Sequence, residues 1–271
     1  CPFTFDVSVW EIFSALCFGR TLHLLNNNKI TNAKYFSEYI IKNSVQSLYI
    51  PPGLLEPLAS GLSLINKGNI KIKRFLTGVE PIRQSVLAKY KKLNPDIIII
   101  NGYGPTEATI CSTFYEFNTA GNPDDITPIG KEIENYSVKI VDNNLKESPT
   151  DVQGEIIIAG AGLARGYINL PDETNRRFIK AEFENCIYKR FYRTGDFGYK
   201  LPDGNIMFSG RKDNQIKFRG YRIELEEIEK AIIKIDGIKE SCVLLKKISD
   251  ETSTLISYYS PDDLNESEVK F

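Results

Sequence analysis

The chain has 271 residues, and its 34 basic and 35 acidic side chains leave a formal net charge of -1. This length is enough for two compact domains, and the balanced charge gives no basis for nucleic acid or an anionic membrane surface as a main partner. The longest apolar runs, at 97–100 and 156–162, are far too short to cross a bilayer.

The first half of the chain alternates between helix and strand patterns. Residues 7–18 are apolar nearly all round, which predicts a buried helix with Asp6 at its N-cap. The further predicted elements are strands at 21–25, 45–50, 71–76 and 96–100, and helices at 33–42 and 82–93. This alternation favours a mainly parallel sheet layered with helices on both faces, in an α/β fold.

The pattern of predicted secondary structure changes after residue 118 and again near residue 213. Short strand patterns at 137–141, 155–159, 195–200 and 205–209 predict a β-barrel-like subdomain. An amphipathic helix at 224–235 and two strands at 240–246 and 253–260 then predict a small α+β subdomain. The expected domains are therefore 1–118, 119–212 and 213–271.

The first residues and the cysteines bear on the compartment of the protein and on whether the chain is part of a longer polypeptide. The first residues contain no Met, basic region or apolar leader, so we expect no signal peptide and interpret the chain as the interior of a longer polypeptide. The five cysteines lack metal-binding spacing, which predicts reduced thiols in the cytoplasm. The single histidine, His23, lies in an alternating run and is expected to be structural, so triad chemistry is disfavoured.

The most informative stretch is Asn-Gly-Tyr-Gly-Pro-Thr-Glu at 101–107, directly after the apolar run 97–100. Glycine and proline fix a tight backbone there. Thr106 and Glu107 add a hydroxyl and a carboxylate at the carboxyl end of a strand, which is where open α/β sheets bind ligands. Mg²⁺ takes oxygen ligands of this kind, together with phosphate and water.

Three further segments accompany this motif. They are Phe-Asp-Val-Ser-Val-Trp-Glu at 5–11, the stretch from Gly-Glu at 154 through Ala-Arg-Gly-Tyr at 164–167 to Tyr-Arg-Thr-Gly-Asp at 192–196, and the charged stretch 210–224. Together the four segments closely resemble the amino-acid adenylation domains of nonribosomal peptide synthetases, in the acyl-adenylate-forming superfamily. The resemblance spans essentially the whole chain in the family's order.

The resemblance implies a nucleotide site. In it Tyr103 stacks on adenine, Asn101 meets the exocyclic amine of the base, and Asp196 holds the ribose, with Arg211 and Phe208 alongside. Thr106 is implied beside the reacting carboxylate and α-phosphate, and Glu107 as the magnesium-associated carboxylate. By themselves, Asp196 could equally be a turn residue and Glu107 a helix first-turn carboxylate.

The resemblance also implies a moving part. Asp213 matches the hinge about which a small, mobile C-terminal subdomain rotates between two half-reactions, although a surface Asp in a charged run is the alternative. Lys217 matches a loop that lines the acceptor tunnel in the second half-reaction.

For the substrate, the resemblance assigns Asp6 to the α-ammonium group, a role that can coexist with helix capping. The side-chain pocket is implied to be lined by Val7, Trp10, Gly53, Leu76, Gly78, Gly102, Ile110 and Cys111. This lining is apolar, has three glycines and holds no second charge. We therefore expect room for a bulky side chain, phenylalanine-like first and a large aliphatic one second.

The chain also departs from the family pattern. The lysine-containing phosphate loop is absent before position 1, the C-terminal catalytic lysine is absent before Phe271, and Val79 replaces a usual glycine. The fold is thus expected to be truncated at both ends, and the isolated fragment is expected not to adenylate at a normal rate.

The implied function is activation of an amino acid with Mg-ATP to aminoacyl-AMP, followed by loading onto the phosphopantetheine arm of a carrier domain. ATP, Mg²⁺ and phosphopantetheine are the expected cofactors, and a condensation domain is a further expected partner. The alternatives are an acyl-CoA or aryl-acid ligase, against which Asp6 argues, and a non-catalytic docking module, against which Thr106, Glu107, Asp196, Arg211 and Asp213 argue.

Overall fold

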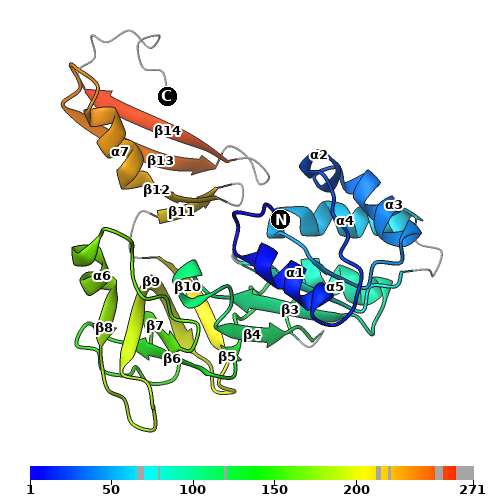
Figure 1. Ribbon diagram of the computed structural model, residues 1–271, viewed down its shortest axis with the longest axis horizontal. Coiled ribbons are helices and arrows are strands. Elements are labelled where there is room, and N and C mark those ends of the chain that lie inside the picture. The colour runs from blue at the N-terminus through cyan, green and yellow to red at the C-terminus, as the bar shows by residue number, and fades with distance from the viewer. Residues whose placement is uncertain are drawn as a thin grey trace. The chain divides into compact units, whose positions relative to one another are not determined.

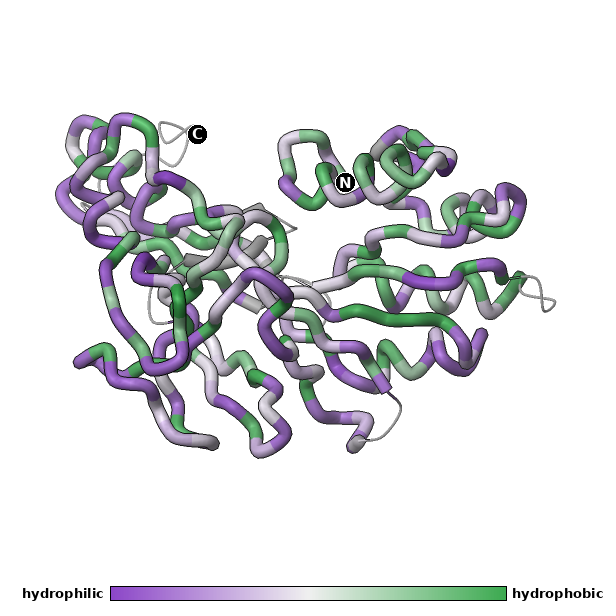
Figure 2. Tube along the Cα trace, turned by 60° about the horizontal axis from the view of Figure 1, so that its bottom comes forward, coloured by the Kyte–Doolittle hydropathy of each residue, from purple (hydrophilic) through white to green (hydrophobic). Residues whose placement is uncertain are grey.

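A computed structural model describes residues 1–65, 70–78, 80–118, 121–211, 215–218, 221–247 and 253–260. The chain divides into two compact units, Cys1–Gly210 and Arg211–Phe271. Hydrophobic and hydrophilic residues are interspersed along the chain (Figure 2). Within the ranges just given, no helix is long and apolar enough to cross a membrane. The three-domain division remains a prediction.

The first unit contains a five-stranded sheet with the order β1-β2-β3-β4-β5. Figure 1 labels β3, β4 and β5 of this sheet. Its first three strands are parallel, and β4 and β5 extend the sheet antiparallel. The bounds are β1 Ser47–Tyr49, β2 Arg74–Gly78, β3 Ile98–Tyr103, β4 Thr113–Glu116 and β5 Lys131–Glu132. The predicted α/β class with a mainly parallel sheet is therefore confirmed.

Strand register divides this sheet into two apolar faces. Leu48, Phe75 and Ile99 lie side by side across the parallel strands and belong to the largest hydrophobic core. The helices that contribute to this core are α3 Ala33–Lys42, α4 Pro52–Ile65 and α5 Gln84–Leu93, with the short α2 Asn27–Ile30 packed on it. On the opposite face of the sheet, the row of side chains that begins with Tyr49 packs with residues at the start of α1 Val7–Leu16.

Two predictions about the elements of this unit are wrong, and one helix was not predicted. The helix at 7–18 is not buried: Val9, Phe13 and Leu16 are 46%, 58% and 55% exposed, and only Val7 and Ser8 are buried. Apolar composition predicted burial, but only the first turn of α1 meets the sheet. Residues 21–25 form no strand.

The helix that was not predicted is α4, because Pro51 and Pro52 were interpreted as ending the preceding strand. Pro52 instead occupies the first position of the helix, where a missing N–H costs nothing. Pro57 also lies inside this helix.

A second sheet follows, with the order β10-β9-β7-β6 and with β8 paired to β9. Its strands are β6 Tyr136–Val141, β7 Gly154–Gly160, β8 Phe178–Lys180, β9 Arg190–Lys200 and β10 Ile206–Arg211, and α6 Pro171–Arg177 precedes β8. Ile156 and Ile158 face one core, and Ile157 and Ala159 face another. This antiparallel sheet is the predicted barrel-like part, and β9 is longer than the expected 195–200.

The second unit has its own small core, formed by Leu225, Ile232, Ile238 and Val243. The predicted amphipathic helix and hairpin are present. Its elements are β11 Gln215–Phe218, β12 Tyr221–Glu224, α7 Leu225–Ile233, β13 Glu240–Lys247 and β14 Ser253–Ser260. The β11–β12 pair was not predicted, because a charged stretch carries little strand signal.

Candidate nucleotide and amino-acid site

The motif at 101–107 forms the carboxyl end of β3 and a tight turn. Asn101, Gly102 and Tyr103 close the strand, and a short 3₁₀ helix, η1 Thr106–Ala108, follows. Thr109 and Ile110 have φ angles of 57° and 70°, so the chain reverses into β4. A Cβ on Gly104 would lie 2.8 Å from the Cα of Cys111, so only glycine fits against the returning strand.

Tyr103 and Asp196 come from different sheets and meet here. The Tyr103 hydroxyl donates to Oδ2 of Asp196 at 2.6 Å, and both side chains are 7% exposed. The ring of Phe208 lies 6.4 Å from the ring of Tyr103, centroid to centroid. The structure thus gathers three of the residues predicted for the nucleotide. Asn101 is buried and donates from Nδ2 to the Pro128 carbonyl at 2.7 Å.

Glu107 is buried beside two tyrosines. The hydroxyl of Tyr167 donates to Oε1 of Glu107 at 2.6 Å and lies 3.1 Å from the hydroxyl of Tyr192. Burial, and then the hydrogen bond with Glu107, raise the pKa of Tyr167 well above its ordinary value, so it stays a donor. Sequence reasoning missed Tyr167, although the Ala-Arg-Gly-Tyr segment that contains it had been recognised as a motif.

Thr106 and Asp6 are joined although 100 residues separate them. The Thr106 hydroxyl donates to Oδ2 of Asp6 at 2.7 Å. Asp6 occupies the predicted N-cap position of α1, but its side chain makes no capping hydrogen bond. Asp6 has helical φ and ψ angles of -58° and -28°, whereas N-cap residues typically adopt extended angles.

Five of the residues predicted for the substrate gather in one apolar cluster. Val7 and Leu76 are buried in it, and Trp10, Ile110 and Cys111 pack against it. Tyr49, which was not predicted, is a third buried member and lies next to Leu76 across the sheet. Its signal was the alternation of β1, which turns Tyr49 away from the large core and toward α1.

The three predicted glycines differ in their surroundings. A Cβ on Gly102 would lie 2.7 Å from Sγ of Cys111, and a Cβ on Gly78 would lie 1.9 Å from the Gly102 carbonyl oxygen. These two glycines allow the chain segments to pack closely. Gly53 is exposed on α4, and no heavy atom lies within 4 Å of the place that a Cβ would take, so it does not join the apolar cluster.

Burial and the nearby Asp6 raise the pKa of the Cys111 thiol to about 12. Burial and the carboxylates of Glu80, Glu11 and Asp6 also raise the pKa of Tyr49. Both groups therefore stay neutral at physiological pH.

Some predicted residues cannot be related to this cluster. Asp213 and Val79 lie outside the described residues, as does the side chain of Lys217 in β11. Arg211 begins the second compact unit. Their roles remain predictions.

The residues present fit a magnesium ion that arrives with a nucleotide. Across the described ranges, no group of three or more His, Cys, Asp or Glu side chains could hold a metal by itself. Glu107 supplies one buried carboxylate. Mg²⁺ commonly takes only one or two carboxylates and completes its shell with phosphate oxygens and water.

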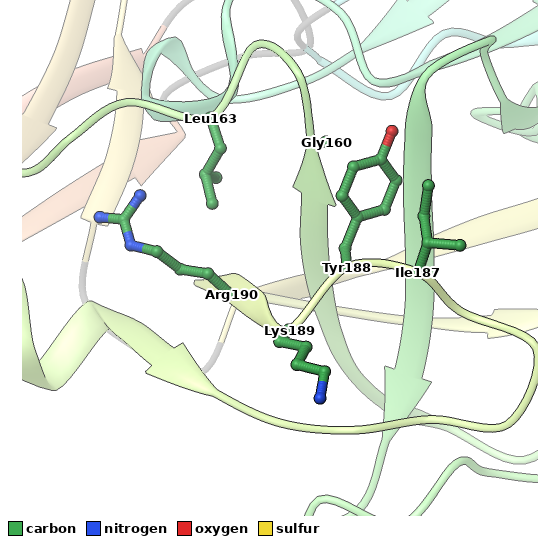
Figure 3. Close-up of a pocket in the computed structure, with 6 residues that line it drawn as sticks. All are labelled: Gly160, Leu163, Ile187, Tyr188, Lys189 and Arg190. Atoms are coloured by element: carbon green, nitrogen blue, oxygen red, sulfur yellow. The ribbon is translucent and has the colours of Figure 1, made fainter.

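A separate surface hollow of about 400 Å³ lies on the second sheet (Figure 3). It is lined by Gly160, Leu163, Ile187, Tyr188, Lys189 and Arg190. Arg190 donates to the carbonyls of Ala164 and Arg165 at 2.7 Å each and so braces that loop. None of the predicted site residues lines this hollow.

Comparison with known proteins places these observations in a family. Residues 1–168 match the family described as AMP-binding enzyme. The chain is 35% identical over 261 residues to tyrocidine synthase 2 of Brevibacillus parabrevis, and 35% identical over 255 residues to bacitracin synthase 1 of Bacillus licheniformis. Both alignments cover 94% of this chain, but they cover only 7% and 4% of the respective relatives.

A solved structure shares the fold. It is that of PA1221, an NRPS protein containing adenylation and PCP domains, and it superposes with a TM-score of 0.80 at 27% identity. The match covers 98% of this chain and 53% of the other. The chain therefore belongs to the AMP-binding enzyme family, among the adenylation domains of nonribosomal peptide synthetases.

Proposed function

We propose that this chain supplies the amino-acid and nucleotide site of an ATP-dependent adenylating ligase. In the proposed reaction, the carboxylate of an amino acid attacks the α-phosphate of Mg-ATP, which yields aminoacyl-AMP and pyrophosphate. The aminoacyl group then passes to the phosphopantetheine thiol of a carrier domain. No protein nucleophile is needed, and catalysis rests on positioning and charge stabilisation.

The observation that carries the proposal is the hydrogen bond from Thr106 to Asp6, at 2.7 Å. In the proposed site Asp6 pairs with the α-ammonium group, and Thr106 lies beside the reacting carboxylate and α-phosphate. An α-amino acid carries those two groups on one carbon, so their protein partners must be neighbours. Glu107, next to Thr106, would hold the magnesium ion that accompanies the phosphates.

For the substrate side chain, we propose a bulky apolar or aromatic residue, phenylalanine-like first and large aliphatic second. Support comes from the apolar cluster around Val7, Leu76 and Trp10. The predicted pocket residues include no Lys or Arg, so an acidic substrate side chain would find no countercharge among them.

We also propose a carrier domain and a condensation domain as partners, and a cytoplasmic location. The similarity to a protein that contains adenylation and PCP domains supports the carrier domain. All five cysteines are unpaired, as in a reducing compartment.

The test is pyrophosphate exchange over a panel of amino acids, with the full-length polypeptide and its Asp6→Asn variant. The variant keeps the size of the side chain and an acceptor for Thr106 but removes the charge. Asp6 is partly buried, and a hydrogen bond to a charged group is worth about 1.5–3 kcal/mol, so kcat/KM for the preferred amino acid should fall by at least ~10-fold.

Asp96→Asn is the matched control, because Asp96 is an exposed carboxylate that precedes the opposite end of β3. It should retain wild-type activity. Unchanged kinetics in Asp6→Asn would favour a ligase for acids that lack an amino group. A full-length protein that does not bind ATP would instead point to a docking module.

A further inference from the structure

Glu155, the second residue of β7, holds two groups of β9 at once. The residue is only 8% exposed. Oε2 accepts from Nε of Arg193 at 3.0 Å and also from Nη2 of the same guanidinium. Oε1 accepts from the backbone N–H of Gly195 at 3.3 Å. Both carboxylate oxygens are therefore committed to the segment just before Asp196.

That segment is a bulge in the sheet. Glu155 pairs with Phe197 and Ile157 pairs with Arg193, so the register shifts between these two pairs. The additional β9 residues lie between Arg193 and Phe197, and Gly195 among them has a φ of 73°. Bulges of this kind redirect a side chain, and here the redirected side chain is Asp196.

The bulge is secured from both strands. On the β9 side, the Thr194 hydroxyl donates to the Ile156 carbonyl at 2.6 Å and accepts from the Asp196 N–H at 2.9 Å. On the β7 side, the Glu155 carboxylate holds the N–H of Gly195. The position of the Asp196 carboxylate, which Tyr103 contacts at 2.6 Å, thus depends on Glu155.

We infer that Glu155 is a positioning residue for nucleotide recognition: it fixes the 193–197 bulge so that the Asp196 carboxylate can accept the ribose hydroxyls of ATP. The inference rests on the proposed function, in which Asp196 holds the ribose. Glu155 itself touches no substrate. It acts through the geometry of Gly195 and Arg193.

The experiment measures dissociation constants of ATP and of 2′,3′-dideoxy-ATP for the full-length polypeptide, by titration calorimetry. In the wild type, ATP should bind at least about tenfold more tightly, because only ATP offers hydroxyls to Asp196. In Glu155→Ala this ratio should fall at least about fivefold, while the affinity for the dideoxy analogue changes less than about twofold. Glu155→Gln keeps an acceptor for Gly195 and should recover part of the ratio.

Glu147→Ala is the matched control, because Glu147 also pairs with a cation on this sheet, Lys139 at 3.2 Å, but far from the bulge in sequence. It should keep the wild-type ratio. If Glu155→Ala weakens both nucleotides equally, or keeps the wild-type ratio, the inference is overturned and Glu155 is merely structural. If Glu155→Ala fails to fold, the ratio of affinities for ATP and 2′,3′-dideoxy-ATP in Glu155→Gln tests the inference instead.

A wild-type ratio near one would overturn the ribose site itself, and the inference with it. A different result is a wild type that prefers ATP over the dideoxy analogue, with Glu155 variants that keep the same preference. The two failures therefore separate the proposed function from the role of Glu155.

Discussion

At the scale of single residues, Asp6 links the two halves of the proposed first step. Its carboxylate takes a hydrogen bond from Thr106 and leaves α1 without a side-chain cap. An ionised carboxylate has about four lone-pair positions, so a substrate ammonium can bind Asp6 while Thr106 remains in contact. The proposed amine site and the proposed site of the reacting carboxylate are therefore one hydrogen bond apart.

Cys111 yields a prediction at the same scale. Burial and Asp6 raise its pKa to about 12, so its thiolate fraction at pH 8 should be about 10⁻⁴. In the folded protein, iodoacetamide at pH 8 should modify the exposed Cys17 and Cys242 and spare Cys111. Mass spectrometry of the alkylated peptides checks this.

The sign of the accompanying stability effect follows from the same shift. The unfolded thiol loses its proton near its ordinary pKa of 9.0, and the folded thiol near a pKa of about 12. This contribution to stability is therefore complete below about pH 9 and is lost as pH rises toward 12. In denaturant all five cysteines should react, and modification of Cys111 as fast as Cys17 in the folded state would contradict the prediction.

At the scale of elements, the parallel strands approach each other so closely at their carboxyl ends that two glycines face one another. Gly78 pairs with Gly102, and Gly78 has a φ of 144°. Side chains of α1 and of the turn after η1 then close over this end of the sheet, in the cluster of Val7, Leu76 and Cys111.

We therefore expect Gly78→Ala to be strongly destabilising. The added methyl would meet a backbone carbonyl at 1.9 Å in a conformation unfavourable to L residues, which should cost about 3 kcal/mol or more. Gly53→Ala is the matched control: it adds the same methyl on α4 where no atom lies within 4 Å, and helix propensity should make it neutral or stabilising by up to about 1 kcal/mol. Urea denaturation of both variants measures the difference, and equal stabilities would refute the packing argument.

The helices of the first unit also show which features local sequence patterns can predict. The helix at 33–42 was predicted with its observed bounds, and the structure shows that Asn32 caps it by accepting from the Tyr35 N–H. The helix α4 was missed because proline was interpreted as a terminator, and the exposure of α1 could not be predicted because periodicity does not say what covers an apolar face.

At the scale of the whole molecule, the chain consists of two compact units that meet in sequence at Gly210 and Arg211. The proposed hinge, Asp213, follows closely in sequence. The proposed function has two half-reactions, adenylation and thioester formation, and the hinge proposal assigns a different arrangement of the two parts to each.

If Asp213 is the hinge, Asp213→Pro should impair the two half-reactions unequally, because proline fixes φ near -65° and restricts the preceding residue. We expect pyrophosphate exchange to change less than about twofold and thioester formation on the carrier to fall at least ~10-fold. Labelled pyrophosphate measures the exchange rate, and labelled amino acid measures thioester formation, both in the full-length polypeptide. Asp213→Ala, which keeps backbone freedom, should alter neither rate by more than about twofold. Equal losses in both half-reactions with proline would argue against a hinge.

The sequence by itself determined the fold class and the family and predicted the residues of the proposed site, because these reside in local patterns: strand and helix periods, and motifs of a few adjacent residues. Only the tertiary structure decided that Thr106 contacts Asp6, that Tyr103 contacts Asp196 across 93 residues, and that Tyr49 joins the apolar cluster. It also decided that Gly78 and Gly102 are packing glycines and that Glu155 secures a bulge. The physical reason is that periodicity fixes which face a side chain occupies, whereas its partner on that face is set by strand register and by turns far away in the chain.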